Sequence, residues 1–228
     1  MTRLQYGGGR LRRMNTRFLA LAAVVLPSDP GTMWKSVADR LLSTVIEVHG
    51  QKAHETIRYG TGVLIGNGLA ITTLHAVALP SANGRMTPLE EVQVLVPDAG
   101  PMDAQVITGV PDLDLAILLL PGQATSLEGA RLATGVPVQG DGLIAMGAAN
   151  DAITAVGVVV SAVDGDLFAL ASKGMIDSRY WGGPLFDAQG RLAGIHLTSM
   201  GASKAISAPA IQRLLDQRPV IPGSPSLP

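Results

Sequence analysis

Trp181-Gly-Gly-Pro-Leu185 is the most informative part of this chain of 228 residues. A short apolar run, 184–186, follows the two glycines, and a longer apolar run, 191–197, comes after the polar segment 187–190. Two apolar runs separated by a few turn residues that include glycine are typical of a β-hairpin. The stretch therefore predicts a glycine-rich loop that leads directly into a hairpin.

Further short apolar runs, separated by turn residues, fill the chain on both sides of this hairpin. Glycine (27 residues) and proline (15) are frequent and aromatic residues make up only 4%, which suits many short strands joined by tight turns. The runs before a linker near 125–130 are 43–49, 60–66, 69–74, 92–96, 103–108 and 114–120, and those after it are 142–146, 155–161, 167–171, 184–186, 191–197 and 203–207. Two groups of six strands predict an all-β fold of two six-stranded antiparallel barrels, an arrangement that removes exposed sheet edges.

Helical spacing of apolar residues occurs at both ends of this array. It predicts an N-terminal helix over 33–42 and a short C-terminal helix over 208–217. The expected organisation is a signal-like or disordered segment, a first barrel, a second barrel with the terminal helix, and a disordered proline-rich tail. These four parts cover residues 1–31, 32–124, 125–217 and 218–228.

Composition excludes several classes of function. The formal net charge is −1, so no basic excess points to nucleic acid. Without cysteine the chain has no disulfide framework and no thiolate metal site. His49 and His54 form no spaced ligand set, and His196 in an apolar strand is more typical of a core or pocket wall. We therefore predict neither a metal nor a cofactor.

The N-terminus resembles a targeting signal. Four arginines within residues 10–17 precede the nine apolar residues 18–26, as in a secretory signal peptide, and the apolar run is too short to span a bilayer comfortably. These arginines are Arg10, Arg12, Arg13 and Arg17. The pattern predicts export to the periplasm or the medium, with a disordered arm followed by a core segment as the alternative, since no clear cleavage site is present.

Two more segments carry residues of catalytic type. Thr72-Thr-Leu-His75 places a histidine at the end of a predicted strand, and Asp112-Leu-Asp114-Leu-Ala places an aspartate at the start of another. Asp114 lies 39 positions after His75, and Trp181 lies 67 positions after Asp114. In residue types and chain order the three segments resemble the trypsin-like serine proteases, most closely the bacterial HtrA (Deg) branch. The corresponding motifs of that branch are Thr-Asn-x-His-Val-Val, Asp-Leu-Ala-Val-Leu and Gly-Asn-Ser-Gly-Gly-Pro-Leu. The resemblance covers about residues 33–217.

The resemblance implies a role for each of these positions. His75 matches the general base and Asp114 the acid that orients it. Trp181 stands where the family has its serine nucleophile. Arg179 stands at the glycine whose backbone N–H, with that of residue 181, forms the oxyanion hole, and Tyr180 replaces the asparagine before the serine.

These departures predict an inactive member of the family. An indole has no hydroxyl to form an acyl-enzyme, and a side chain at 179 disfavours the backbone angles that glycine allows. We therefore expect His75 and Asp114 to be vestigial and Trp181 either to fill an unused cleft or to form an interaction patch with Arg179 and Tyr180. The alternative is an active endopeptidase that uses a displaced serine such as Ser178.

Peptides or proteins are the expected partners, because backbone pairing to a strand edge needs no catalytic serine. The matching edge comprises Leu197, Thr198 and Ser199. The sequence leaves the oligomeric state open.

Overall fold

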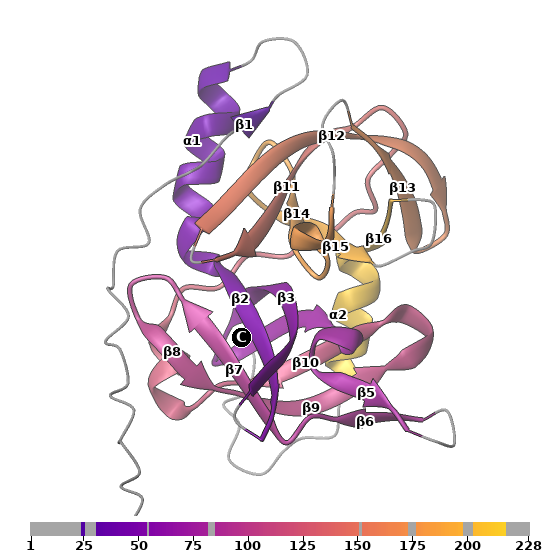
Figure 1. Ribbon diagram of the computed structural model, residues 1–228. Coiled ribbons are helices and arrows are strands. Elements are labelled where there is room, and N and C mark those ends of the chain that lie inside the picture. The colour runs from indigo at the N-terminus through magenta and orange to yellow at the C-terminus, as the bar shows by residue number, and fades with distance from the viewer. Residues whose placement is uncertain are drawn as a thin grey trace, which may run out of the picture.

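The computed structural model describes residues 24–25, 31–53, 55–81, 85–150, 152–172, 177–197 and 203–217. The predicted proline-rich tail, His54, Thr198 and Ser199 lie outside the described residues, as does the predicted targeting segment apart from 24–25 and Gly31. The described chain forms two seven-stranded sheets, one above the other in Figure 1, and one small two-stranded sheet.

The lower sheet in Figure 1 has seven antiparallel strands in the order β8-β7-β2-β3-β4-β10-β9. Their bounds are β2 (Val45–Lys52), β3 (Glu55–Gly66), β4 (Leu69–Thr73), β7 (Glu91–Val96), β8 (Gly100–Asp103), β9 (Gln105–Val110) and β10 (Leu115–Leu119). A separate small hairpin consists of β5 (Ala78–Pro80) and β6 (Met86–Pro88). The sheet curls around a core of aliphatic side chains.

The upper sheet closes on itself, because β12 pairs with both β11 and β13. Its strands are β11 (Gly142–Ala149), β12 (Ala152–Asp164), β13 (Leu167–Ala171), β14 (Pro184–Phe186), β15 (Leu192–Leu197) and β16 (Lys204–Ser207). A two-residue strand, β1 (Val24–Val25), adds to β12 in parallel. The predicted hairpin at 184–197 is β14–β15.

The expected all-β double-barrel fold is confirmed, with one difference in the first sheet. The run expected as a single strand at 103–108 is divided at Ala104 into β8 and β9, which lie at opposite ends of the sheet order. Ala104 donates its backbone N–H to the Val92 carbonyl oxygen at 2.8 Å, so the chain turns there. The division makes seven strands instead of six.

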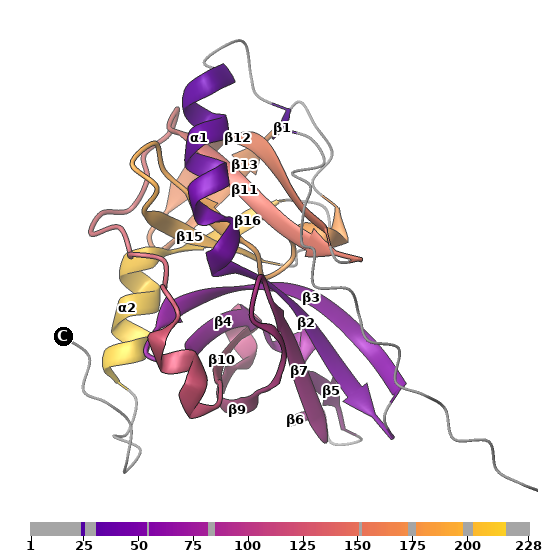
Figure 2. The ribbon, with the colours of Figure 1, turned by 90° about the vertical axis from the view of Figure 1, so that its left-hand side faces the viewer.

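Helices α1 (Gly31–Leu41) and α2 (Ala208–Asp216) lie where the sequence predicts them. Each buries one apolar face: Val37 and Ala38 in α1, Ile211 and Leu215 in α2. Both faces join a core cluster that also contains side chains from the two sheets. Figure 2 shows α1 beside the upper sheet and α2 next to the lower one.

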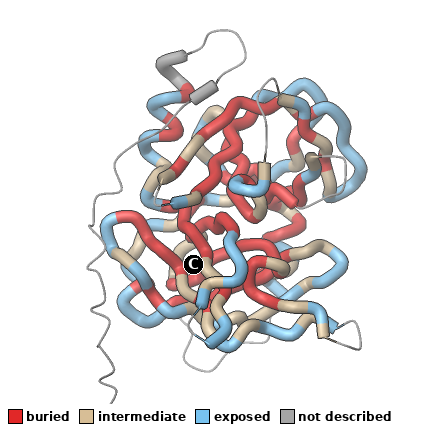
Figure 3. The backbone as a smooth tube through the Cα atoms, in the orientation of Figure 1, coloured by how far each residue is buried: buried red, intermediate tan, exposed pale blue. Residues whose placement is uncertain are grey.

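Burial follows the secondary structure. The buried parts of the backbone tube in Figure 3 run along the strands, and the exposed parts are mainly turns and helix faces. Each fully buried aliphatic side chain contributes about 1.5–3 kcal/mol. Because the shared cluster joins the sheets, residues at their junction are held by packing from both sides.

Candidate active site

His75 and Asp114 are brought together by two neighbouring strands. β4 and β10 are antiparallel partners, with Thr73 opposite Leu115. His75 lies in a short 3₁₀ turn (Leu74–Ala76) directly after β4, and Asp114 lies directly before β10 with φ of 48°. Aspartate is one of the few residues with a side chain that adopts this left-handed conformation readily.

Two hydrogen bonds join the pair. His75 Nδ1 lies 2.7 Å from Asp114 Oδ2, and the backbone N–H of His75 donates to Asp114 Oδ1 at 2.9 Å. A carboxylate at Nδ1 favours the imidazole tautomer whose proton is on that nitrogen. The geometry therefore matches the base-and-acid arrangement that the resemblance implies for these two positions.

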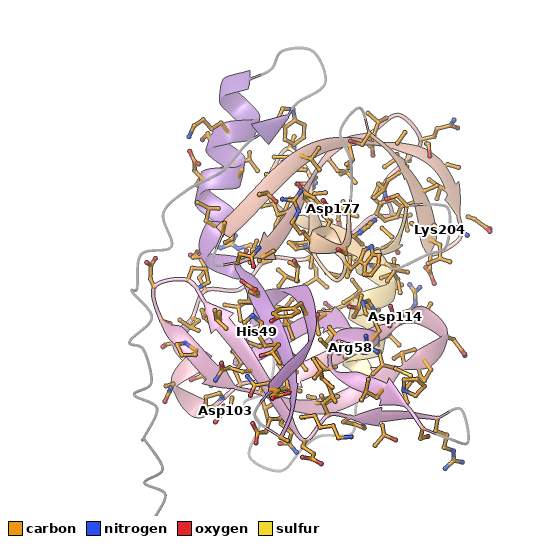
Figure 4. All side chains as sticks on the ribbon, viewed as in Figure 1. His49, Arg58, Asp103, Asp114, Asp177 and Lys204 are labelled. Atoms are coloured by element: carbon orange, nitrogen blue, oxygen red, sulfur yellow. The ribbon has the colours of Figure 1, made fainter. Side chains whose placement is uncertain are left out.

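The loop at 178–183 comes from the second sheet and meets this pair. Figure 4 labels Asp177 on the upper half of the molecule and Asp114 on the lower half. Thr61 of β3 donates its backbone N–H to the Trp181 carbonyl oxygen at 3.0 Å, and the carbonyl oxygen of His196 accepts from Gly182 at 2.9 Å. Backbone hydrogen bonds thus fix the loop from both sheets.

Gly182 is required by this geometry. Its φ is +76°, and a Cβ added there would lie 2.4 Å from the Thr61 carbonyl oxygen. Only glycine combines a positive φ with so close an approach of two backbones.

Trp181 lies against the His75 ring. The two ring centroids are 5.4 Å apart with an interplanar angle of 79°, which is an edge-to-face contact. The position that the resemblance assigns to the nucleophile therefore presents an indole to the imidazole.

Both backbone N–H groups at the oxyanion-hole positions have acceptors within the loop itself. Arg179 N–H donates to Asp177 Oδ1 at 2.9 Å, and Trp181 N–H donates to the Ser178 carbonyl oxygen at 3.2 Å. The second bond closes a 3₁₀ turn (Ser178–Tyr180) for which Asp177 is the N-cap.

The side chain of Arg179 is turned back onto the same aspartate. Its Nε and Nη2 both donate to Asp177. This hydrogen bonding lowers the pKa of Asp177, against the opposing effect of burial. Sequence reasoning missed Asp177, although an aspartate before Ser-Arg-Tyr is an N-cap signal.

A cavity of about 330 Å³ opens beside Trp181. Ser178 and Arg179 line it from the loop, as does Trp181, and His75 lies on its wall. The remaining lining residues are Ile57, Arg58, Tyr59, Gly60, Ala148 and Ala149. Sequence reasoning did not find Arg58 and Tyr59, because they come from the strand before the motif that the family shares.

His196 is buried beneath the loop. Its Nδ1 lies 3.1 Å from the Tyr180 carbonyl oxygen and its Nε2 lies 2.7 Å from Ser203 Oγ. Burial lowers the pKa of His196, partly offset by the hydrogen bond to Tyr180. Leu197, the described member of the predicted peptide edge, is buried and pairs with Lys204 of β16.

Within the described ranges, no group of three or more His, Cys, Asp or Glu side chains is placed to hold a metal ion. Neither described helix combines the length and apolar character that a bilayer span needs.

Comparison with known proteins identifies the family of this chain. The family model for the trypsin-like peptidase domain matches residues 60–195. A curated relative, a probable membrane transporter protein named MamO from Paramagnetospirillum magneticum, is 31% identical over 163 residues. That match covers 62% of this chain but only 23% of the relative, so the chain spans about a quarter of its length.

Solved structures show the same fold at low identity. A serine endoprotease from Yersinia pestis is 20% identical, with a TM-score of 0.69 over 84% of this chain and 67% of that one. The active form of a protease from M. tuberculosis is 18% identical, with a TM-score of 0.68 over 97% of this chain and 99% of that one. The resemblance to the trypsin-like proteases is confirmed, and the chain belongs to the trypsin-like peptidase domain family.

Proposed function

We propose that this chain is a serine peptidase homologue that does not hydrolyse peptides and that acts by binding peptides or proteins. The observation that carries the proposal is the edge-to-face contact of Trp181 with His75 at 5.4 Å. The base has an indole beside it at the position from which the family's serine attacks. An indole offers no hydroxyl for the base to deprotonate, so no acyl-enzyme forms at this position.

The oxyanion hole supports the same proposal independently. Its two positions donate to Asp177 and to the Ser178 carbonyl oxygen. An N–H that already has an internal acceptor is not directed at a substrate oxyanion. Removing one such donor lowers the rate by about 10²–10³, so the loss of both leaves little catalysis even if a nucleophile is present.

His75 and Asp114 have a structural role in this proposal. Together they join the residues that follow β4 to those that precede β10 through two hydrogen bonds. Hydrogen bonds to charged groups contribute about 1.5–3 kcal/mol each. That contribution is a sufficient reason for the pair to persist as a vestigial base and acid.

Peptide or protein partners fit the cleft that remains. The family fold suggests such partners, and pairing with a strand edge uses backbone groups only. The edge at Leu197, Thr198 and Ser199 stays a proposed docking site. Whether the whole protein binds further partners is a separate proposal, since the chain spans about a quarter of its relative.

An active endopeptidase using Ser178 is the second candidate. One observation favours it: Ser178 is exposed and lines the same cavity as His75. Attack by Ser178 still requires an oxyanion hole, and the donors that the family uses are engaged within the loop. This candidate therefore ranks below the inactive homologue.

Three measurements test the proposed function. A fluorophosphonate probe should leave the protein unlabelled, and casein should remain intact; labelling that disappears in Ser178→Ala would establish the second candidate instead. A peptide array should yield binders. If no peptide in a broad array binds, the binding part of the proposal is wrong and the domain has a structural role only.

The proposed location is outside the cytoplasm, because the arginines and the apolar run 18–26 resemble a secretory signal peptide. Expression in a bacterial host followed by fractionation should recover the protein outside the cytoplasm. N-terminal sequencing of that fraction should start after the apolar run, and recovery of the intact N-terminus from the cytoplasm would contradict export.

A further inference from the structure

Two stacks of the same construction stand beside the cavity next to Trp181. In the first, the Asp114 carboxylate binds the His75 ring, and that ring contacts Trp181 edge to face. In the second, the Glu47 carboxylate lies 2.9 Å from His49 Nε2, and the His49 ring contacts Tyr59 edge to face with centroids 5.1 Å apart. Trp181 and Tyr59 both line the cavity.

The second stack fixes an aromatic ring that is largely exposed. Glu47 is buried and also accepts from the backbone N–H of Asn150 at 3.3 Å, so its carboxylate is anchored to both sheets. Tyr59 nonetheless has 62% of its surface exposed. An aromatic ring positioned in advance and left open to solvent loses little conformational entropy when a ligand covers it.

Exposed apolar residues gather at this cavity. Four large hydrophobic residues in the described part of the chain are exposed, and two of them, Ile57 and Tyr59, line it. Apolar surface that is exposed in a group marks interaction sites. The volume of about 330 Å³ is at the lower end of the range for ligand pockets, about 300–1,000 Å³.

The charge on this lining is positive. Of the described lining residues, Arg58 and Arg179 are the ones whose side chains carry a full charge at neutral pH. Arg179 is neutralised by Asp177, whereas Arg58 forms no ion pair with a described acidic side chain. Arg58 and His49 lie on the β2–β3 ribbon in Figure 4. The net positive charge favours an anionic ligand.

The strand that carries Tyr59 also offers backbone groups. β3 pairs with β2 over 55–63 but with β4 only over 62–66, so the second edge of 55–61 faces no described strand. Thr61 directs its N–H to Trp181 and its carbonyl oxygen to Thr72, away from β2. Because backbone direction repeats every two residues in an antiparallel ladder, the N–H and C=O of Tyr59 point the same way.

From these observations we infer that the cavity binds an extended peptide segment in which an aromatic side chain is followed by an acidic one. The peptide backbone pairs with the β3 edge at Tyr59. The aromatic side chain lies between the rings of Tyr59 and Trp181, and the acidic side chain pairs with Arg58. This assignment rests on the proposed function: it names the class of peptide that binds in a cleft that no longer hydrolyses peptides.

The test uses the full chain and fluorescein-labelled nonapeptides read by fluorescence anisotropy. The reference peptide has phenylalanine followed by glutamate at its centre, with glycine and serine elsewhere. Alanine in place of the phenylalanine, or lysine in place of the glutamate, should weaken binding by about tenfold or more, as expected for contacts that dominate an interface.

Variants of the protein locate the site. Tyr59→Ala should weaken binding of the reference peptide by about tenfold, whereas Tyr59→Phe, which keeps the ring, should retain it. Arg58→Glu should reverse the charge preference, so that the lysine peptide binds better than the glutamate peptide. Val138→Ala is the matched control, because Val138 is 63% exposed and does not line the cavity. Equal thermal midpoints establish that the variants fold.

The outcomes separate the two proposals. Binding of the reference peptide that is unchanged in Tyr59→Ala and Arg58→Glu overturns this site but leaves peptide binding elsewhere. If the reference peptide does not bind although the array yields other binders, the proposed site is likewise wrong, and peptide binding elsewhere stands. The array alone decides whether the chain binds peptides at all.

Discussion

Asp177 accepts the backbone N–H of Arg179 at 2.9 Å and binds the guanidinium of the same residue through both carboxylate oxygens. One aspartate thus satisfies the N–H at a position that the resemblance assigns to the oxyanion hole. Under the proposed function, residue 181 is therefore not the only feature of the loop that opposes catalysis. The contact also leads to predictions that separate the nucleophile from the loop.

Replacing the tryptophan alone should not restore strong activity. In Trp181→Ser the hydroxyl returns, but Asp177 still accepts from Arg179. We expect turnover of casein at least about 10²–10³ below that of active relatives. A triple variant, Asp177→Gly with Arg179→Gly and Trp181→Ser, should be faster than the single variant. Turnover of the single variant near that of active relatives would show that the loop does not limit catalysis.

Removing the cap should destabilise the domain modestly. Asp177→Ala deletes the N-cap of the turn and the partner of Arg179. Loss of an N-cap costs about 0.5–2 kcal/mol. Urea denaturation measures the change, and Asp177→Asn, which keeps a capping oxygen, should lose less. Equal losses in the two variants would show that the cap does not contribute.

Gly182→Ala should be strongly destabilising, because it combines a positive φ with a Cβ 2.4 Å from the Thr61 carbonyl oxygen. Gly140→Ala is the matched control: its φ is +94° but an added Cβ meets nothing within 4 Å. Backbone strain alone costs about 1–3 kcal/mol. Urea denaturation gives the free energy of unfolding of each variant, and the difference between the two losses measures the cost of the close backbone approach at Gly182. Similar losses in the two variants would contradict a contribution from that approach.

Stability should fall as the pH falls below about 6.5. Burial lowers the pKa of His196 in the folded state below its ordinary value of 6.5. The unfolded chain then binds a proton more readily, so the contribution of neutral His196 is present above pH 6.5 and is lost as the pH decreases from there. Urea denaturation between pH 8 and pH 5 measures the slope. His196→Asn should flatten it, whereas an unchanged slope would assign the effect to other groups.

Local patterns predicted much of this molecule. The apolar runs and turn residues around 184–197 specified the β14–β15 hairpin, and helical spacing specified α1 and α2. The residue type at 181 excluded a serine nucleophile there. These features depend on neighbours within a few positions, which is why one sequence is enough to find them.

The tertiary structure decided how distant parts meet. The sequence placed one strand at 103–108, but pairing of β7 with β8 and of β10 with β9 divides it. Likewise, nothing near Tyr59 indicates that it shares a cavity with Trp181, which comes from the other sheet. Contacts between the two sheets depend on how their curved surfaces pack together, and no local periodicity records that packing. The edge-to-face contact of Trp181 with His75 belongs to the same class, because the loop that carries the indole is held by Thr61 across the junction of the two sheets.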